Sequence, residues 1–145
     1  MLFRSLRELF AFKDLAIPFA HAGFAAKRSF LKNHENETLA FLRAMSKAVY
    51  RMMTDKPFST RVIQKVSRLE DKAIVDVGYE LHANQFLQKK LYTTAPMIQT
   101  VLRQVGETVP AALNANPNDF MDNRFAQILD QRGLYTELDR AFKPR

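Results

Sequence analysis

Histidine, cysteine and serine are the first residues to consider for chemistry, and their spacing in this chain does not support it. His21, His34 and His82 are far apart, and none has a second histidine four residues away, the spacing that places two imidazoles on one helix face around a metal ion. The chain has no cysteine, so it has no thiolate nucleophile and no cysteine-based metal site. It also lacks a glycine-rich phosphate loop and a nucleophile elbow. We therefore predict no catalytic residue, no metal site and no cofactor.

Acidic residues occur close together at Glu70-Asp71 and at Asp119 and Asp122. Each of these sites lies at a predicted helix start. A carboxylate there accepts hydrogen bonds from free backbone N–H groups and interacts favourably with the helix dipole. Helix capping explains these residues better than acid–base catalysis, and we do not predict an enzyme.

The chain is basic, with 22 lysines and arginines against 15 aspartates and glutamates, a formal charge of +7. Such an excess could serve nucleic acid, an anionic membrane or an anionic solute. The cations are scattered along the sequence without a long basic run. We interpret most of them as a solvated surface.

Apolar residues at three- and four-residue spacing predict a helix over residues 36–53, the clearest in the chain. Shorter helices are predicted over residues 58–67, after the cap at residues 67–71, and after a cap at Thr94. Their expected buried residues are, in order along the chain: Leu39, Leu42, Met45 and Val49; Val62, Ile63 and Val66; Ile74, Val77, Gly78 and Leu81; Ile98, Val101, Leu102 and Val105.

The last third of the chain contains two helix starts in quick succession. Asn116 can cap a helix with Pro117 at its first position, where a missing N–H costs nothing. Asp122 can cap the next helix, which ends at Gly133, and a closing helix follows over residues 134–142. The face expected to be buried in the second helix contains Phe125, Ile128 and Leu129.

Residues 19–27 are small and apolar and are predicted to form a strand or an extended crossing. A single strand is unstable without partners, so we expect its partners to be encoded upstream and the chain to be a fragment. Residues 1–5 match the translation of a common sequencing adapter. We therefore expect the native sequence to begin near Leu6.

Three stretches of the chain, taken in order, resemble one family. The first is LAIPFAHAGFAAKRSFL, residues 15–31; the second is ETLAFLRAM, residues 37–45; the third starts with YTT at residue 92 and continues through IQTVL at 98–102 and NPNDFMDNRF at 116–125. They are similar to segments of the ABC-transporter substrate-binding proteins for sulfonates, taurine, nitrate and thiamine-pyrimidine precursors. Glu35, Thr93 and Pro96 depart from the family pattern, and all of them are helix-entry positions.

The resemblance implies an α/β fold, the two-lobed type II periplasmic-binding-protein fold, with ligand bound in the cleft between the lobes. This chain would supply its C-terminal portion over residues 6–145. Residues 15–28 would cross between the lobes, and residues 29–145 would form a mostly helical remainder, with one or two strands in all.

The same resemblance implies the solute-binding component of an ABC importer. The protein would capture a small anionic ligand of the sulfonate, nitrate or taurine kind, or a pyrimidine precursor, by lobe closure, and deliver it to a membrane permease. The candidate ligand-binding residues are His21, Ala22 and Gly23. Gly23 would permit close backbone approach, and His21 would offer an N–H to an anionic oxygen. A core or hinge role is the alternative for each.

We further expect a periplasmic or extracytoplasmic location, with a signal peptide lost upstream, a monomer when full length, and no nucleic-acid partner. Two alternative hypotheses stay open. One is a small basic helical protein that binds nucleic acid or an anionic membrane, with an affinity that falls steeply with salt. The other is a helical interaction domain without a ligand. An enzyme of the pyrimidine-precursor branch is a further alternative, although the sequence lacks residues recognisable for that chemistry.

Overall fold

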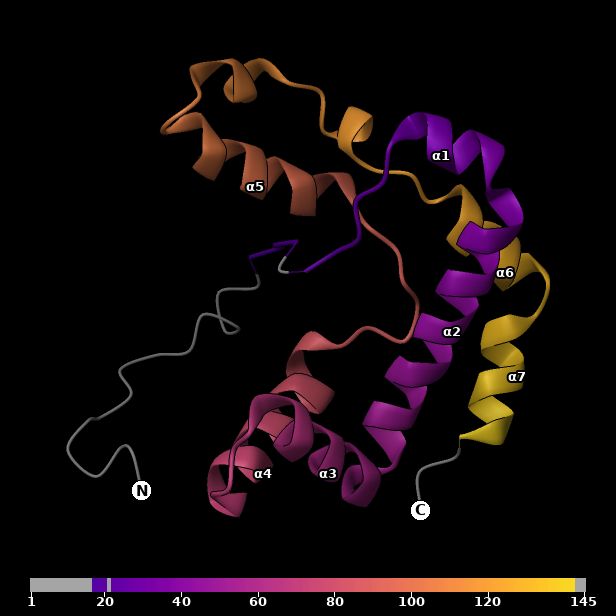
Figure 1. Cartoon of the computed structure of the whole chain (residues 1–145). Coiled ribbons are helices and arrows are strands. Elements are labelled where there is room, and N and C mark those ends of the chain that lie inside the picture. The colour runs from indigo at the N-terminus through magenta and orange to yellow at the C-terminus, as the bar shows by residue number, and fades with distance from the viewer. Residues whose placement is uncertain (1–16, 21, 143–145) are drawn as a thin grey trace.

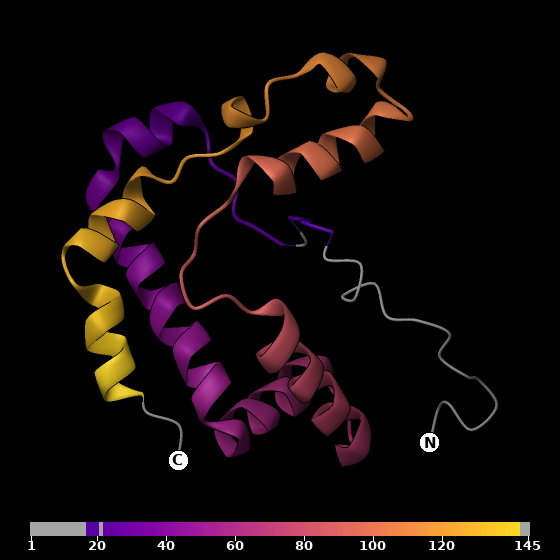
Figure 2. The same ribbon diagram turned by 180° about the vertical axis from the view of Figure 1, so that it is seen from behind.

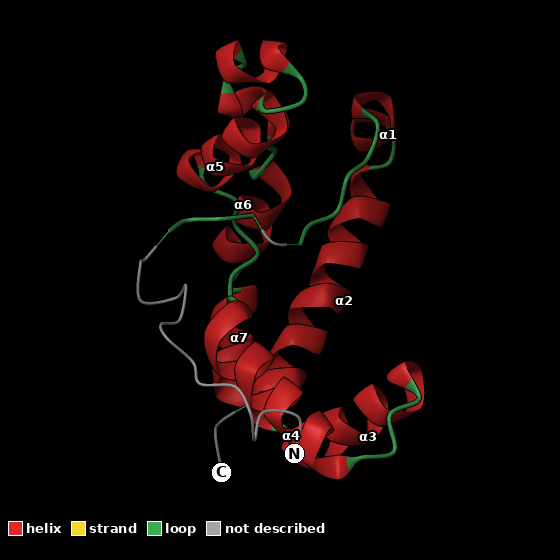
Figure 3. Cartoon of the chain, turned by 90° about the vertical axis from the view of Figure 1, so that its left-hand side faces the viewer, coloured by secondary structure: helices red, strands yellow, loops and turns green. Residues whose placement is uncertain are grey.

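The computed structural model describes residues 17–20 and 22–142 of the chain, except the side chain of Gln85. Within this part every regular element is helical (Figures 1 and 3). The elements are α1 (Arg28–Asn33), α2 (Glu35–Thr54), α3 (Lys56–Ser67), α4 (Lys72–Leu81), η2 (His82–Phe86), α5 (Ala95–Gly106), η3 (Pro110–Asn114), η4 (Pro117–Phe120), α6 (Arg124–Gln131) and α7 (Leu134–Ala141).

The central body of the molecule is α2 with α6 and α7 packed along it (Figure 1). Its core is a cluster of fully buried side chains, against which Leu39, Leu42 and Phe142 pack. Each fully buried aliphatic or aromatic side chain stabilises the fold by about 1.5–3 kcal/mol relative to an exposed one. The cluster consists of Tyr50, Leu129, Leu134, Tyr135 and Leu138.

Two arms leave this body near opposite ends of α2 and project to the same side of it (Figures 1 and 2). The first arm contains α3, α4 and η2, and α3 also packs against α2. The second arm is α5, with η3 and η4 folded back along it. Among the described residues, α5 makes no extensive contact with the first arm or with the central body.

The predicted α/β fold class is wrong, because the described residues form an all-helical arrangement. Of residues 19–27, predicted as a strand or extended crossing, those that the structure describes (19, 20 and 22–27) form no strand and include a bend at Ala22. Extended backbone becomes a strand only beside a second extended segment with which it exchanges hydrogen bonds. Here the segment is attached through a side chain instead: the Phe24 ring meets the Phe41 ring of α2 edge to face, with centroids 4.8 Å apart.

The faces predicted to be buried on α3 and α4 are only partly correct. On α3, Ile63 is half-buried, but Val62 is 42% exposed and Val66 is 76% exposed, whereas the small polar residue Ser59 is buried. On α4, Val77 is 64% exposed and Tyr79 is buried. The apolar periodicity alone therefore misplaces part of the buried face of each helix.

A lysine at the start of α3 accounts for the orientation of α4. The Lys56 ammonium lies 2.7 Å from Glu80 and 3.6 Å from Asp76, and 5.6 Å from the centre of the Tyr79 ring. These contacts turn the Tyr79 side of α4 toward α3. Burying an aromatic ring beneath an ion pair satisfies both the apolar and the charged groups.

Most predicted helix ends are close to those observed. The Asn116 side chain accepts a hydrogen bond from Asn118 N at 3.1 Å, as a cap should, although the element that follows is the single 3-10 turn η4. Asp122 accepts from Arg124 N at 3.1 Å, but the N-cap residue of α6 is Asn123, one position later than predicted. Gly133 separates α6 from α7 with a left-handed φ of 79°.

Two glycine substitutions test this backbone assignment. Gly133→Ala should lower the free energy of unfolding by about 1 kcal/mol, because a side chain is strained at positive φ. Gly78→Ala should raise it by about 0.5–1 kcal/mol, because alanine is the better helix former and a Cβ at this α4 position meets nothing within 4 Å. Urea unfolding followed by circular dichroism measures both. Equal effects of the two substitutions would contradict the left-handed turn at Gly133.

Candidate functional site

The predicted ligand-binding residues belong to the part of the chain that precedes α1, where the described residues form no helix or strand. His21 is outside the described residues. Ala22 and Gly23 are both exposed, and a Cβ added at Gly23 would meet nothing within 4 Å. The structure therefore places two of the three residues together on an accessible stretch of backbone, without a close neighbour that would require glycine.

This segment is fixed to the rest of the molecule just after Gly23. Phe24 contacts Phe41, as described above. At the start of α1, the Arg28 guanidinium donates a hydrogen bond of 2.7 Å to the backbone carbonyl of Asp119 in η4. The segment is thus tied both to α2 and to the second arm.

The best-organised polar cluster is centred on residues 87–94, which we call the connector because they join the two arms across the central body (Figure 1). The Lys89 ammonium lies 2.9 Å from Asp139 of α7, and the Tyr50 hydroxyl donates to the same carboxylate at 3.3 Å. The Lys90 ammonium lies 2.7 Å from Asp130 of α6. The two lysines thereby hold the connector to two different helices.

The connector is also held through its backbone and through the Tyr92 side chain. Thr93 N donates to the Asn123 side-chain oxygen at 3.0 Å, and the Asn123 amide group donates back to the Thr93 carbonyl at 2.7 Å. Leu91 N donates to the Tyr135 hydroxyl at 3.4 Å. The Tyr92 hydroxyl donates to Asp130 at 3.1 Å. Side chains of the central body therefore take the place of the missing strand or helix partners for this backbone.

The pKa shifts in the connector follow from these ion pairs. The hydrogen bond from Lys90 lowers the pKa of Asp130, and the same bond raises the pKa of Lys90. The hydrogen bond from Lys89 likewise lowers the pKa of Asp139. Burial, followed by the nearby Asp139 charge, raises the pKa of Tyr50. Each group is stabilised in its usual charge state, which suits a structural role and gives no poised acid or base.

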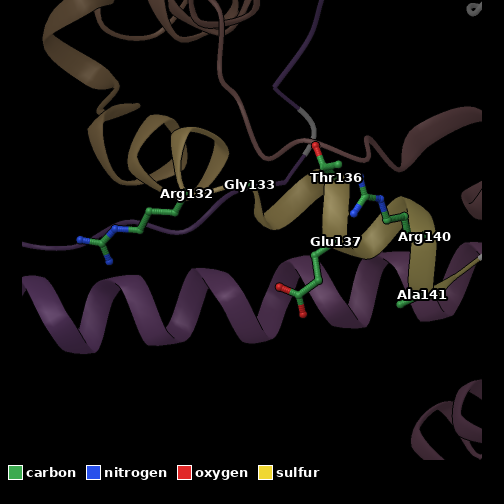
Figure 4. Close-up of a pocket in the computed structure, with 6 residues that line it drawn as sticks. All are labelled: Arg132, Gly133, Thr136, Glu137, Arg140 and Ala141. Carbon is green, nitrogen blue, oxygen red and sulfur yellow. The ribbon is translucent and has the colours of Figure 1, made fainter.

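A shallow depression of about 630 Å³ lies over the turn between α6 and α7 and is lined by Arg132, Gly133, Thr136, Glu137, Arg140 and Ala141. Arg132 and Arg140 could bind one anion together only if both guanidinium groups were directed to the same position. Figure 4 shows Arg132 directed away from Arg140, and Glu137 on the side that faces α2. The depression therefore does not present a converging set of cationic groups.

A second depression, of about 390 Å³, lies along α4 between Asp76 and Asn84.

In the described part of the chain, no three histidine, aspartate or glutamate side chains are grouped closely enough to hold a metal ion. Nor does any helix within it have the length and apolar character needed to cross a membrane. The chain matches no family model, and comparisons with curated proteins and with solved structures find no match either.

The sequence interpretation missed the connector contacts. The connector follows the π-helical turn η2 and has no periodic pattern of its own that would indicate these contacts. The available signals were the paired lysines Lys89 and Lys90, followed by Tyr92. Their partners Asp130 and Asp139 lie 40 and 50 residues away along the chain, beyond the reach of local pattern reasoning.

Asn123 is the residue whose removal most directly tests the connector. Asn123→Ala removes two hydrogen bonds to the part-buried Thr93 backbone and leaves an N–H and a C=O without partners, so the free energy of unfolding should fall by about 1–3 kcal/mol. Gln127→Ala is the matched control, because Gln127 is exposed on α6; it should change that free energy by less than about 0.5 kcal/mol. Equal losses from both would contradict the role of Asn123.

The ion pairs predict a loss of stability in acid. Folding lowers the pKa of Asp130 and of Asp139, so their contribution is present above the ordinary aspartate pKa of about 3.9 and is lost as pH falls through the lower folded-state values. Urea titrations from neutral pH downward should show the free energy of unfolding decreasing from about pH 5. The decrease should be smaller in the Asp130→Asn, Asp139→Asn double variant. If the free energy of unfolding of the double variant depended on pH as steeply as that of the unsubstituted protein, the two carboxylates would have the same pKa in the folded and unfolded states, which would contradict the prediction.

Proposed function

We propose that the protein is the solute-binding component of an ABC importer. It captures a small anionic solute of the sulfonate, nitrate or taurine kind, or a pyrimidine precursor, and passes it to a membrane permease outside the cytoplasm. The proposal starts from the sequence resemblance in residues 15–31, 37–45 and 92–125. We propose that it acts as a monomer, so that each molecule binds one solute.

One structural observation supports the proposal: the stretches that carry the resemblance are joined to one another. Phe24 of the first stretch contacts Phe41 of the second. Arg28 of the first binds the Asp119 carbonyl of the third. Thr93 and Asn123, from two separate parts of the third stretch, exchange two hydrogen bonds. The similar residues therefore belong to one connected framework, as expected if they were retained for a common purpose.

In this proposal the segment 21–23 is the part of the chain that touches the solute. Ala22 and Gly23 are exposed, so their backbone N–H groups are accessible to an anionic oxygen. His21 would add a side-chain N–H. Binding would favour a closed arrangement that already exists among the states of the protein, without a chemical step.

The alternative hypothesis, a small basic helical protein that binds nucleic acid through its overall positive charge, has less support. Lys56, Lys89, Lys90 and Arg124 each lie within ion-pair distance of a carboxylate. These paired cations do not add to a common basic face for nucleic acid. The formal charge of +7 is compatible with an anionic solute.

A thermal-shift screen tests the proposal. The protein is heated with taurine, an alkanesulfonate, nitrate or a hydroxymethylpyrimidine. A solute that binds the folded state stabilises it by about 2.7 kcal/mol at a concentration one hundred times its Kd. We expect a saturable rise in Tm with one of these solutes. A cooperatively folded protein that responds to none of them would contradict the proposed solute class.

Substitutions in the protein then locate the site. His21→Ala and Gly23→Val should each weaken solute binding about tenfold or more by calorimetry, since one removes a donor and the other obstructs backbone approach. His34→Ala is the control, because His34 is an exposed histidine that pairs with Glu37 at 3.2 Å. Unchanged affinity in both site variants would move the site away from residues 21–23.

A further inference from the structure

The outer surface of α3 combines apolar and cationic residues in a regular pattern. Val66 is 76% exposed, the most exposed of the large apolar residues in the described chain, and Val62 is 42% exposed. Arg61 and Lys65, the residues immediately before these valines, are also exposed. Val62 and Val66 are four residues apart, so they adjoin on the helix surface and form one apolar stripe.

Helix geometry places these residues in two adjacent stripes. At about 100° per residue, Val62 and Val66 lie within about 40° of each other, and so do Arg61 and Lys65. Each cation is displaced by about 100° from the valine that follows it. By the same count the buried Ser59 lies about 20° from Val66 and about 60° from Val62, so the valines border the buried side of α3, whereas Arg61 and Lys65 lie on the far side. The exposed surface of α3 thus has one apolar stripe with one cationic stripe next to it.

The pattern continues into the turn that follows α3. Leu69 is 39% exposed, and Arg68 is exposed with a left-handed φ of 54°. Of the two acidic residues that come next, Asp71 is occupied in capping α4, where it accepts from Ala73 N at 2.8 Å. This turn lies at the outer end of the first arm (Figure 3).

The cations on this surface are available to a partner. Within the described residues, Arg61, Lys65 and Arg68 form no ion pair with a carboxylate, in contrast to Lys56 at the other end of the same helix. Their charge is therefore not neutralised inside the molecule. We name the group Arg61, Val62, Lys65, Val66, Arg68 and Leu69 the α3 surface.

We propose that the α3 surface binds an anionic phospholipid membrane. A helix that lies in the bilayer interface buries apolar side chains at the headgroup boundary while lysines and arginines beside them contact lipid phosphates. Charge complementarity with an anionic leaflet supplies the attraction, and the valines supply apolar area that a purely electrostatic partner would not use. Nucleic acid fits less well, because the α3 surface has no aromatic ring on which a base could stack. The inference does not depend on the proposed importer function.

A tryptophan reporter tests the contact directly. The chain contains no tryptophan, so Val66→Trp introduces a single probe at the centre of the α3 surface. With vesicles containing phosphatidylglycerol, its emission should shift to the blue and become protected from a soluble quencher; with phosphatidylcholine vesicles it should not. Phe120→Trp is the control, since Phe120 is 59% exposed on the second arm and should show no shift. A shift in both variants, or in neither, would overturn the proposal.

Charge removal provides a second, independent measurement. Lys65→Gln should weaken binding to phosphatidylglycerol vesicles in a flotation assay about fivefold, the effect of one cation near an anionic surface, and binding should decline as salt is raised. Arg103→Gln, at an exposed position on α5, should leave it unchanged. Circular dichroism confirms that each variant keeps its helical content. Equal binding of Lys65→Gln and the unsubstituted chain, or preference for a DNA duplex over the vesicles, would contradict membrane recognition.

Discussion

The reciprocal hydrogen bonds between Thr93 and Asn123 determine how the two halves of this molecule meet. The connector has no regular structure of its own after η2, and its backbone must still find donors and acceptors. Asn123 can supply both, because a primary amide carries a donor and an acceptor in one plane. This pair fixes where the chain leaves the central body to enter α5, and hence where the second arm begins.

The ion pairs beside it contribute orientation more than energy. Lys89 and Asp139 are each more than half exposed, and exposed pairs of this kind are each worth about 0–1 kcal/mol. The fully buried Leu129 and Leu134 contribute more, at about 1.5–3 kcal/mol each. The apolar cluster therefore holds α2, α6 and α7 together, and the charged groups determine the register at which the connector crosses them.

Local sequence signals were sufficient for helix positions but not for helix orientation. Caps at Asn116 and the break at Gly133 were predictable, because these residues have intrinsic backbone preferences. The burial of Tyr79 in place of Val77 was not predictable from periodicity, because Lys56 fixes the side of α4 that faces α3 through partners at residues 76 and 80. The strand over residues 19–27 failed for a related reason: extended character is local, whereas strand pairing is a property of two segments. For the candidate site, the sequence could name residues 21–23 but could not show what surrounds them.

The two arms differ in what their exposed apolar residues imply. On the second arm, Gly106 is buried against Leu113, whose Cγ atom would lie 2.6 Å from an added Cβ. The facing sides of α5 and η3 are therefore packed closely against each other. On the first arm, Val62 and Val66 of α3 are exposed, and each follows a cation, Arg61 or Lys65, that forms no ion pair within the described residues. A surface that served only to remain in water would not need those valines, and one that packed against another helix would not need the cations. The combination suits the interface of an anionic membrane, where the valines contact the acyl region and the neighbouring cations contact lipid phosphates.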